Sequence, residues 1–146
     1  MGRVRLPLPG EFLFETEIPV RITDINYGGH AGNDALLSLL QEARVRMLRT
    51  RGWTELDAGG AGIIMTDAIL VYASQISYGT VLRIRIATAD FGGGSCDLLY
   101  QVTDADSGRE LARAKTGIAF YDYARKKVVP IPGDFPAAFP PGGTAE

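Results

Sequence analysis

The sequence predicts an α+β domain in which one long helix is enclosed by an antiparallel sheet. Three patterns indicate this: one strand pattern near the start, one strong helical pattern over residues 33–51, and four strand patterns after it. A helix with an apolar surface and a sheet with one apolar face bury these surfaces against each other. A five-stranded sheet wrapped around a central helix is therefore the simplest arrangement.

The first strand is expected over residues 12–23, FLFETEIPVRIT, which are rich in β-branched and aromatic residues. Pro19 has no N–H group to donate to a neighbouring strand, so this segment belongs at a sheet edge or at a bulge. The glycine-rich stretch DINYGGHAGND, Asp24 to Asp34, follows directly and contains the chain's only histidine.

The helix is expected over residues 33–51, where apolar residues recur at helical spacing. Asn33 or Asp34 is expected to cap its start, and Gly52 to end it. Four leucines between residues 36 and 40 make the first half apolar around most of its circumference. Such a helix is enclosed by other elements rather than lying on a surface.

After the helix the hydrophobic pattern changes to period two. Between residues 82 and 86, for example, leucine and isoleucines alternate with two arginines. Short connections such as TDADSGRE imply antiparallel pairing of consecutive strands. The four expected strands cover residues 62–73, 80–91, 95–104 and 110–122.

The composition is that of an ordinary globular domain, with 46% apolar and 22% charged residues in 146. We expect one domain over residues 1–146, with irregular proline-rich ends at about 1–11 and 130–146. A net charge of −2 gives no support for nucleic-acid binding. No apolar run approaches the ~18 residues of a membrane span.

Cysteine and histidine each occur once, as Cys96 and His30. A single cysteine excludes an internal disulfide, which favours a cytoplasmic protein. We expect Cys96 to be a small buried residue, because no nucleophile motif surrounds it. Neither a metal site nor a cofactor is predicted.

The glycine-rich loop and the helix carry a family motif. Many relatives read approximately D-x-D-x-x-G-H-V-N-N, followed by a helix containing F-x-E-A-R. Asp24 matches the first aspartate, Gly29 and His30 the Gly-His pair, Asn33 the last asparagine, and QEAR (residues 41–44) the helix signature. Over residues 15–129 the chain therefore resembles the hotdog-fold thioesterases related to 4-hydroxybenzoyl-CoA thioesterase.

This resemblance implies the hotdog fold and hydrolysis of an acyl-CoA or acyl-carrier-protein thioester. It also implies a homodimer or a homotetramer, because the wide sheet of such domains is completed across a dimer interface. Asn26 stands where many relatives place a catalytic aspartate. An amide cannot accept a proton near neutral pH, so Asn26 can only donate a hydrogen bond or hold a water molecule.

Plant-type acyl-carrier thioesterases in the same family use a loop histidine and a helix glutamate. His30 and Glu42 fall on comparable positions, so the expected catalytic residues are Asn26, His30 and Glu42. An imidazole accepts protons near neutral pH. A structural His30, and an ion pair between Glu42 and Arg46 at i+4, are the alternatives.

Polarisation of the thioester carbonyl requires hydrogen-bond donors. A glycine-rich loop that leads into a helix N-terminus presents free backbone N–H groups and the positive end of the helix dipole. Gly28, Gly29, Asn33 and Asp34 are therefore expected to bind substrate. The alternative is an ordinary turn and cap, in which Asp34 caps the helix and Asp24 anchors the loop.

Two further groups of charged residues have open roles. Asp67 interrupts an apolar strand, which predicts either an exposed acid or a substrate-binding residue at the partner subunit's site. Candidates for the phosphates of a CoA arm lie in two basic segments, which could equally be solvated faces. They are Arg83, Arg85, Arg113 and Lys115 in one group, and residues 125–127 in the other.

Two other functions remain open at this point. A non-catalytic acyl-thioester binding or regulatory protein is the main alternative, because Asn26 replaces the usual carboxylate. A hydratase or dehydratase of the same fold is the third, because His30 precedes the helix.

Overall fold

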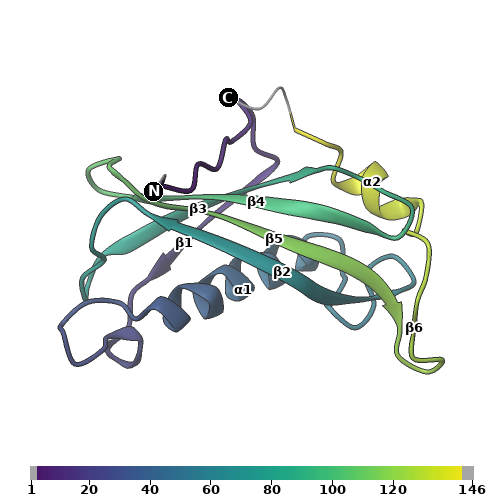
Figure 1. Cartoon of the computed structure of the whole chain (residues 1–146), viewed down its shortest axis with the longest axis horizontal. Helices are drawn as coiled ribbons and strands as arrows, with labels where there is room; N and C mark the ends of the chain where they lie inside the picture. The colour runs from purple at the N-terminus through teal and green to yellow at the C-terminus, as the bar shows by residue number, and fades with distance from the viewer. Residues whose placement is uncertain (1–2, 143–146) are drawn as a thin grey trace.

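The computed structural model describes residues 3–142, in which a curved antiparallel sheet packs one face against the helix α1 (Asn33–Arg49) (Figure 1). The strand order is β1-β3-β4-β5-β2, and a two-residue strand β6 extends the pairing at β5. The hotdog fold is thereby confirmed. The strands are β1 (Phe14–Pro19), β2 (Gly62–Tyr72), β3 (Val81–Ala89), β4 (Ser95–Asp104), β5 (Glu110–Asp122) and β6 (Lys127–Val128).

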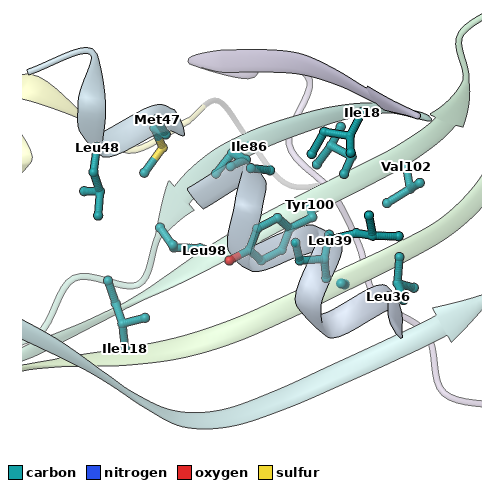
Figure 2. Packing of buried hydrophobic residues seen from close by; sticks show 14 of the residues in the cluster. Ile18, Leu36, Leu39, Met47, Leu48, Ile86, Leu98, Tyr100, Val102 and Ile118 are labelled. Atoms are coloured by element: carbon teal, nitrogen blue, oxygen red, sulfur yellow. The ribbon is translucent and has the colours of Figure 1, made fainter. Parts of the chain in front are cut away.

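Alternation along β3 and β4 turns one apolar row toward α1. Ile84 pairs with Val102 and Ile86 with Tyr100, and all four side chains are fully buried. Figure 2 shows Ile86, Tyr100 and Val102 together with leucines and Met47 of the helix. Because each fully buried Leu or Ile contributes about 1.5–3 kcal/mol, this contact between sheet and helix dominates the stability of the fold.

The five expected strands are all present, but one expected pairing is wrong. β2 pairs with β5, not with the consecutive β3. The connection over residues 73–80 therefore runs from β2 at one edge of the sheet, past β5 and β4, to β3. β3, β4 and β5 do pair in chain order. Pro19 ends β1, which lies at the sheet edge as its proline required.

A buried polar network links the helix to the sheet. Arg44 is only 6% exposed, and its Nε donates to Glu55 Oε2 over 2.7 Å. Its Nη1 donates to the hydroxyl of Tyr100 over 3.1 Å, and that hydroxyl shares a 2.8 Å bond with Thr116 Oγ1. Within this network, Arg44, Tyr100 and Thr116 all have hydrogen-bond partners, as burial away from water requires.

The two ends of the chain cover different parts of the sheet. The N-terminal segment crosses the face opposite α1, where Leu8 packs on Ala87 and Leu99 (Figure 1). Near the other end, residues Asp134–Ala138 form the short helix α2 within a segment expected to be irregular. Its Phe135 contacts the ring of Phe120, with centroids 4.9 Å apart, so apolar packing organises this segment.

Residues 1–2 and 143–146, which belong to the predicted irregular ends, lie outside the described residues. No helix of residues 3–142 combines the length and apolar character that a bilayer crossing demands.

Candidate active site

The loop between β1 and α1 has a defined shape that comes from its own backbone hydrogen bonds. The N–H of Asn26 donates to His30 O over 2.8 Å, and the N–H of Gly29 donates to Asn26 O over 3.0 Å. Gly29 has φ 82°, a left-handed conformation that glycine adopts without steric cost. The N–H of Ala31 donates to Ile76 O over 2.8 Å, which ties the loop to the segment after β2.

Asp24 anchors the start of this loop, as the alternative to a catalytic role proposed. Its carboxylate accepts hydrogen bonds from the backbone N–H and the guanidinium of Arg21, at 2.8 and 3.1 Å. Burial pushes the pKa of Asp24 upward, but the hydrogen bonds and charge of Arg21 outweigh it, so the pKa lies below its usual value. Its backbone oxygen accepts from the N–H of Gly32 over 3.0 Å.

Asn26 uses its side chain within the turn. Its Oδ1 accepts a hydrogen bond from the N–H of Gly28 over 2.9 Å, an arrangement common for asparagine in turns. The N–H groups of Gly28 and Gly29 are thus both bonded to Asn26. Donors to a bound carbonyl must therefore come from elsewhere in the loop or helix.

The first turn of α1 supplies such donors. The expected side-chain cap is wrong: Gly32 is the cap residue and no side chain accepts a hydrogen bond there. Asn33 and Asp34 are themselves the first two helical residues, so their own N–H groups belong to the set without an intrahelical acceptor. The uncapped positive end of the helix is thus available for a ligand oxygen.

A cavity of about 400 Å³ opens at this helix end. Leu36 and Ile76 give it an apolar wall, beside polar side chains from the loop and from the segment after β2. The lining residues are Asn26, His30, Ala31, Gly32, Asn33, Leu36, Tyr72, Ala73, Ser74, Gln75 and Ile76. The structure therefore brings together three expected site residues, Asn26, His30 and Asn33.

Tyr72 is a cavity residue that sequence reasoning did not select. Its hydroxyl donates to Asn33 O over 3.1 Å, which fixes β2 to the start of the helix. Burial, and then the charge of Asp34, raise the pKa of this phenol, so it stays protonated and remains a donor. An aromatic residue at a strand end is common in any core, so no sequence signal marked it.

His30 has a buried ring nitrogen and lies at the cavity. Nδ1 is buried and has no hydrogen-bond partner among the described residues. His30 as a whole is partly buried and lines the cavity. A histidine that only stabilised the fold would be expected to have its buried nitrogen bonded.

Glu42 and Asp67 lie apart from this cavity within the described chain. The carboxylate of Glu42 is 49% exposed and accepts from Arg46 Nε over 2.8 Å, so the alternative ion pair is present. Asp67 is 58% exposed and accepts from Lys115 Nζ over 2.7 Å. Its hydrogen bond with Lys115 is the main cause of its lowered pKa, and the N–H of Gly117 adds a second bond.

Cys96 is buried, and desolvation, with the nearby charge of Asp97, raises the pKa of its thiol to about 12. A thiol of that kind is not a nucleophile near neutral pH. Within residues 3–142, no three side chains of His, Cys, Asp or Glu are grouped as a metal site would require.

Comparison with known proteins identifies the family. The family model described as the Thioesterase-like superfamily matches residues 20–139. The chain belongs to the Thioesterase-like superfamily. No curated protein matches the sequence itself.

Solved structures of similar fold include several thioesterases. A 1,4-dihydroxy-2-naphthoyl-CoA thioesterase from Synechocystis superposes with TM-score 0.77 at 20% identity, covering 86% of this chain and 93% of that one. A gentisyl-coenzyme A thioesterase superposes with TM-score 0.73 at 18% identity, covering 82% and 97%. The PA5185 protein of Pseudomonas aeruginosa superposes with TM-score 0.83 at 18% identity, covering 96% and 99%.

At these identities the structural likeness establishes the fold, and the family match establishes the class. Membership of this superfamily supports acyl thioester hydrolysis as the general activity. The expected hotdog-thioesterase relationship is thereby confirmed, as is the expectation of a hydrolase acting on thioester bonds.

Proposed function

We propose that this superfamily member is an acyl-CoA thioesterase whose reaction takes place in the cavity at the N-terminus of α1. The observation that carries the proposal is a lone histidine, unpartnered at Nδ1, beside an uncapped helix end. The first can accept a proton, and the second can stabilise an oxyanion. Ester and thioester hydrolysis requires both functions.

The carbonyl oxygen of the thioester accepts a hydrogen bond from the N–H group of Asn33, which lines the cavity in the first turn of α1. As water attacks, negative charge grows on this oxygen, and the helix dipole stabilises it. One oxyanion donor of this kind lowers the barrier by roughly 3–4 kcal/mol. The bond from Tyr72 to Asn33 O keeps the first turn in place during this change.

His30 Nε2 takes a proton from the attacking water molecule. The water oxygen bonds to the carbonyl carbon, the carbon–sulfur bond breaks, and the proton passes to the departing thiolate. The products are a carboxylic acid and CoA. No carboxylate contacts Nδ1 among the described residues, so the imidazolium lacks a stabilising partner and the contribution of His30 lies at the low end for a general base.

The acyl group rests on the apolar wall formed by Leu36 and Ile76. CoA is favoured as the carrier by two proteins of similar fold that are named for aromatic acyl-CoA substrates. A cavity of about 400 Å³ lies in the range of small-molecule sites, so aromatic or short acyl groups fit best.

A panel of aryl-, short- and long-chain acyl-CoA substrates, assayed at several pH values, tests the proposal. We expect turnover to be fastest with a small or aromatic acyl group, and kcat to depend on one group that titrates near neutral pH. Turnover at the background rate with the entire panel would contradict an acyl-CoA thioesterase.

A non-catalytic acyl-thioester binding protein is the second candidate, favoured by the amide of Asn26 in the cavity. Asn26→Asp tests it, because aspartate retains the acceptor for the N–H of Gly28 and adds a base. A binder gains hydrolysis on this change, whereas the proposed enzyme already hydrolyses without it. Glu42 enters this reaction only if Glu42→Gln lowers kcat.

We further propose that the working unit is a cytoplasmic homodimer joined through β2. This strand lies at the sheet edge, is 11 residues long, and leaves Met65 half exposed. A long edge strand offers unpaired backbone groups to a second chain. Light scattering should give twice the mass of the chain, or four times if dimers pair.

A further inference from the structure

A second groove adjoins the proposed acyl cavity at the end of β2. It has a volume of about 500 Å³, and Ala73 lines both hollows. The N-terminal segment forms one wall, and β5 with the end of β2 forms the other. The lining residues are Arg3, Val4, Arg5, Leu6, Pro7, Val71, Ala73, Glu110 and Arg113.

Hydrogen bonds of Tyr72 link the groove to the proposed acyl cavity. Its backbone oxygen accepts a hydrogen bond from the guanidinium of Arg3, and its hydroxyl bonds to Asn33 O at the helix start. Arg113 holds the N-terminal segment from the other side, donating to Leu6 O over 3.1 Å. The segment is thus fixed beside the end of β2, which contributes to both hollows.

Positive charge exceeds negative charge in this groove. Three guanidinium groups face a single carboxylate, that of Glu110, which pairs with Arg113 Nε over 2.9 Å. Arg5 has no carboxylate partner within residues 3–142. Its guanidinium is therefore available to an anion from solution.

Of the basic residues suggested by the sequence, Arg113 lines this groove, whereas Arg83, Arg85 and Lys115 lie elsewhere and have carboxylate partners. Arg83 pairs with Glu15 and Glu17, and Arg85 also pairs with Glu15. Lys115 lies between Asp67 and Asp97. Arg83, Arg85 and Lys115 are therefore already paired with carboxylates, whereas Arg5 in the groove is not.

We propose that this groove binds the phosphate groups of CoA, with Arg5 and Arg3 as the principal ligands; the inference rests on the proposed function. Guanidinium groups bind phosphate oxygens in pairs of parallel hydrogen bonds. The pantetheine arm separates the thioester from the pyrophosphate, so a phosphate site must lie beside the acyl cavity. A hollow of about 500 Å³ with three guanidinium groups and one carboxylate suits a nucleotide with its phosphates as the occupant.

The test compares two substrates with the same acyl group, acyl-CoA and the acyl thioester of N-acetylcysteamine, which carries no phosphate. Arg5→Ala should raise KM for acyl-CoA about tenfold, the value of one charge-assisted contact, and leave kcat and the short substrate unchanged. Arg51→Ala, an exposed arginine after the far end of α1, is the matched control and should change neither KM. Equal KM values for wild type and Arg5→Ala would overturn the site.

Calorimetry with free CoA separates this inference from the proposed function, because it requires no hydrolysis. Weaker CoA binding by Arg5→Ala, with unchanged binding by Arg51→Ala, supports the groove even in a protein that hydrolyses nothing. Turnover with no effect of Arg5→Ala rejects the groove and leaves the thioesterase intact. Effects of Arg5→Ala on an acyl-carrier-protein substrate but not on CoA would also reject CoA as the occupant.

Discussion

The buried network around Arg44 and the loop around His30 differ in whether their buried polar side chains have hydrogen-bond partners. In the network, the guanidinium, the phenol of Tyr100 and the hydroxyl of Thr116 all have hydrogen-bond partners. In the loop, backbone hydrogen bonds shape the turn, yet the buried Nδ1 of His30 has no partner among the described residues. An unmade bond costs about 1–3 kcal/mol, so the loop retains its histidine at the expense of stability.

The comparison teaches which region serves folding and which serves chemistry. Satisfied polar groups hold the helix on the sheet, while His30 Nδ1, one of three buried side-chain nitrogens without a partner among the described residues, belongs to a residue that lines the cavity. Substitutions in the network should change stability alone. Substitutions in the loop should change catalysis, with little or opposite effect on stability.

The largest expected effect is that of His30→Ala on catalysis. Removing the general base should lower kcat for the best acyl-CoA about 100-fold, the low end for such a group. The free energy of unfolding should stay within about 1 kcal/mol or rise, because a buried unpartnered nitrogen is removed. Tyr27→Ala, which changes a fully exposed residue of the same loop, is the control. Unchanged kcat in His30→Ala would assign His30 to structure.

Arg44→Met should have the opposite pattern of effects, with a large loss of stability and little change in kcat. Breaking a buried ion pair commonly costs 3–5 kcal/mol, and partial exposure of Glu55 places this one near 3 kcal/mol. Urea unfolding measures the loss, and kcat of the folded protein should change less than twofold. A stable Arg44→Met protein with strongly reduced kcat would show that the network also serves the site.

Asp24→Asn tests the anchor of the loop through pH. The folded-state pKa of Asp24 is lowered, so its stabilisation is present above the unfolded value of ~3.9 and is lost as pH falls through the folded value. The variant should be about 1 kcal/mol less stable at pH 7. Thermal unfolding should show this difference shrinking below about pH 4; a difference independent of pH would exclude the carboxylate charge as its cause.

The smallest expected effect concerns Cys96, which lies in the satisfied core. With its pKa raised to about 12, the native thiol should react with a disulfide reagent far more slowly than after unfolding in urea. Rapid stoichiometric labelling of the native protein would show that the core around β4 opens easily. Cys96→Ser should leave kcat within about twofold.

Local patterns in the sequence were sufficient for the elements and the fold class. Period-two alternation and helical spacing depend only on which residues face a common core, so five strands and α1 follow from them. The loop motif also located Asn26, His30 and Asn33, which the structure collects around one cavity. Motif spacing succeeds here because these residues are close in the chain.

Only the tertiary structure determined which segments distant in the sequence contact one another. The pairing of β2 with β5 places Tyr72 beside Asn33, 39 positions earlier, and no local pattern encodes that contact. Arg46, which pairs with Glu42, also donates a hydrogen bond to Thr16 of β1, and this second contact depends on the tertiary structure. The basic groove exists only because the N-terminal segment crosses the sheet and carries Arg3 and Arg5 to the end of β2. Long-range packing selects among partners that local spacing leaves equally possible.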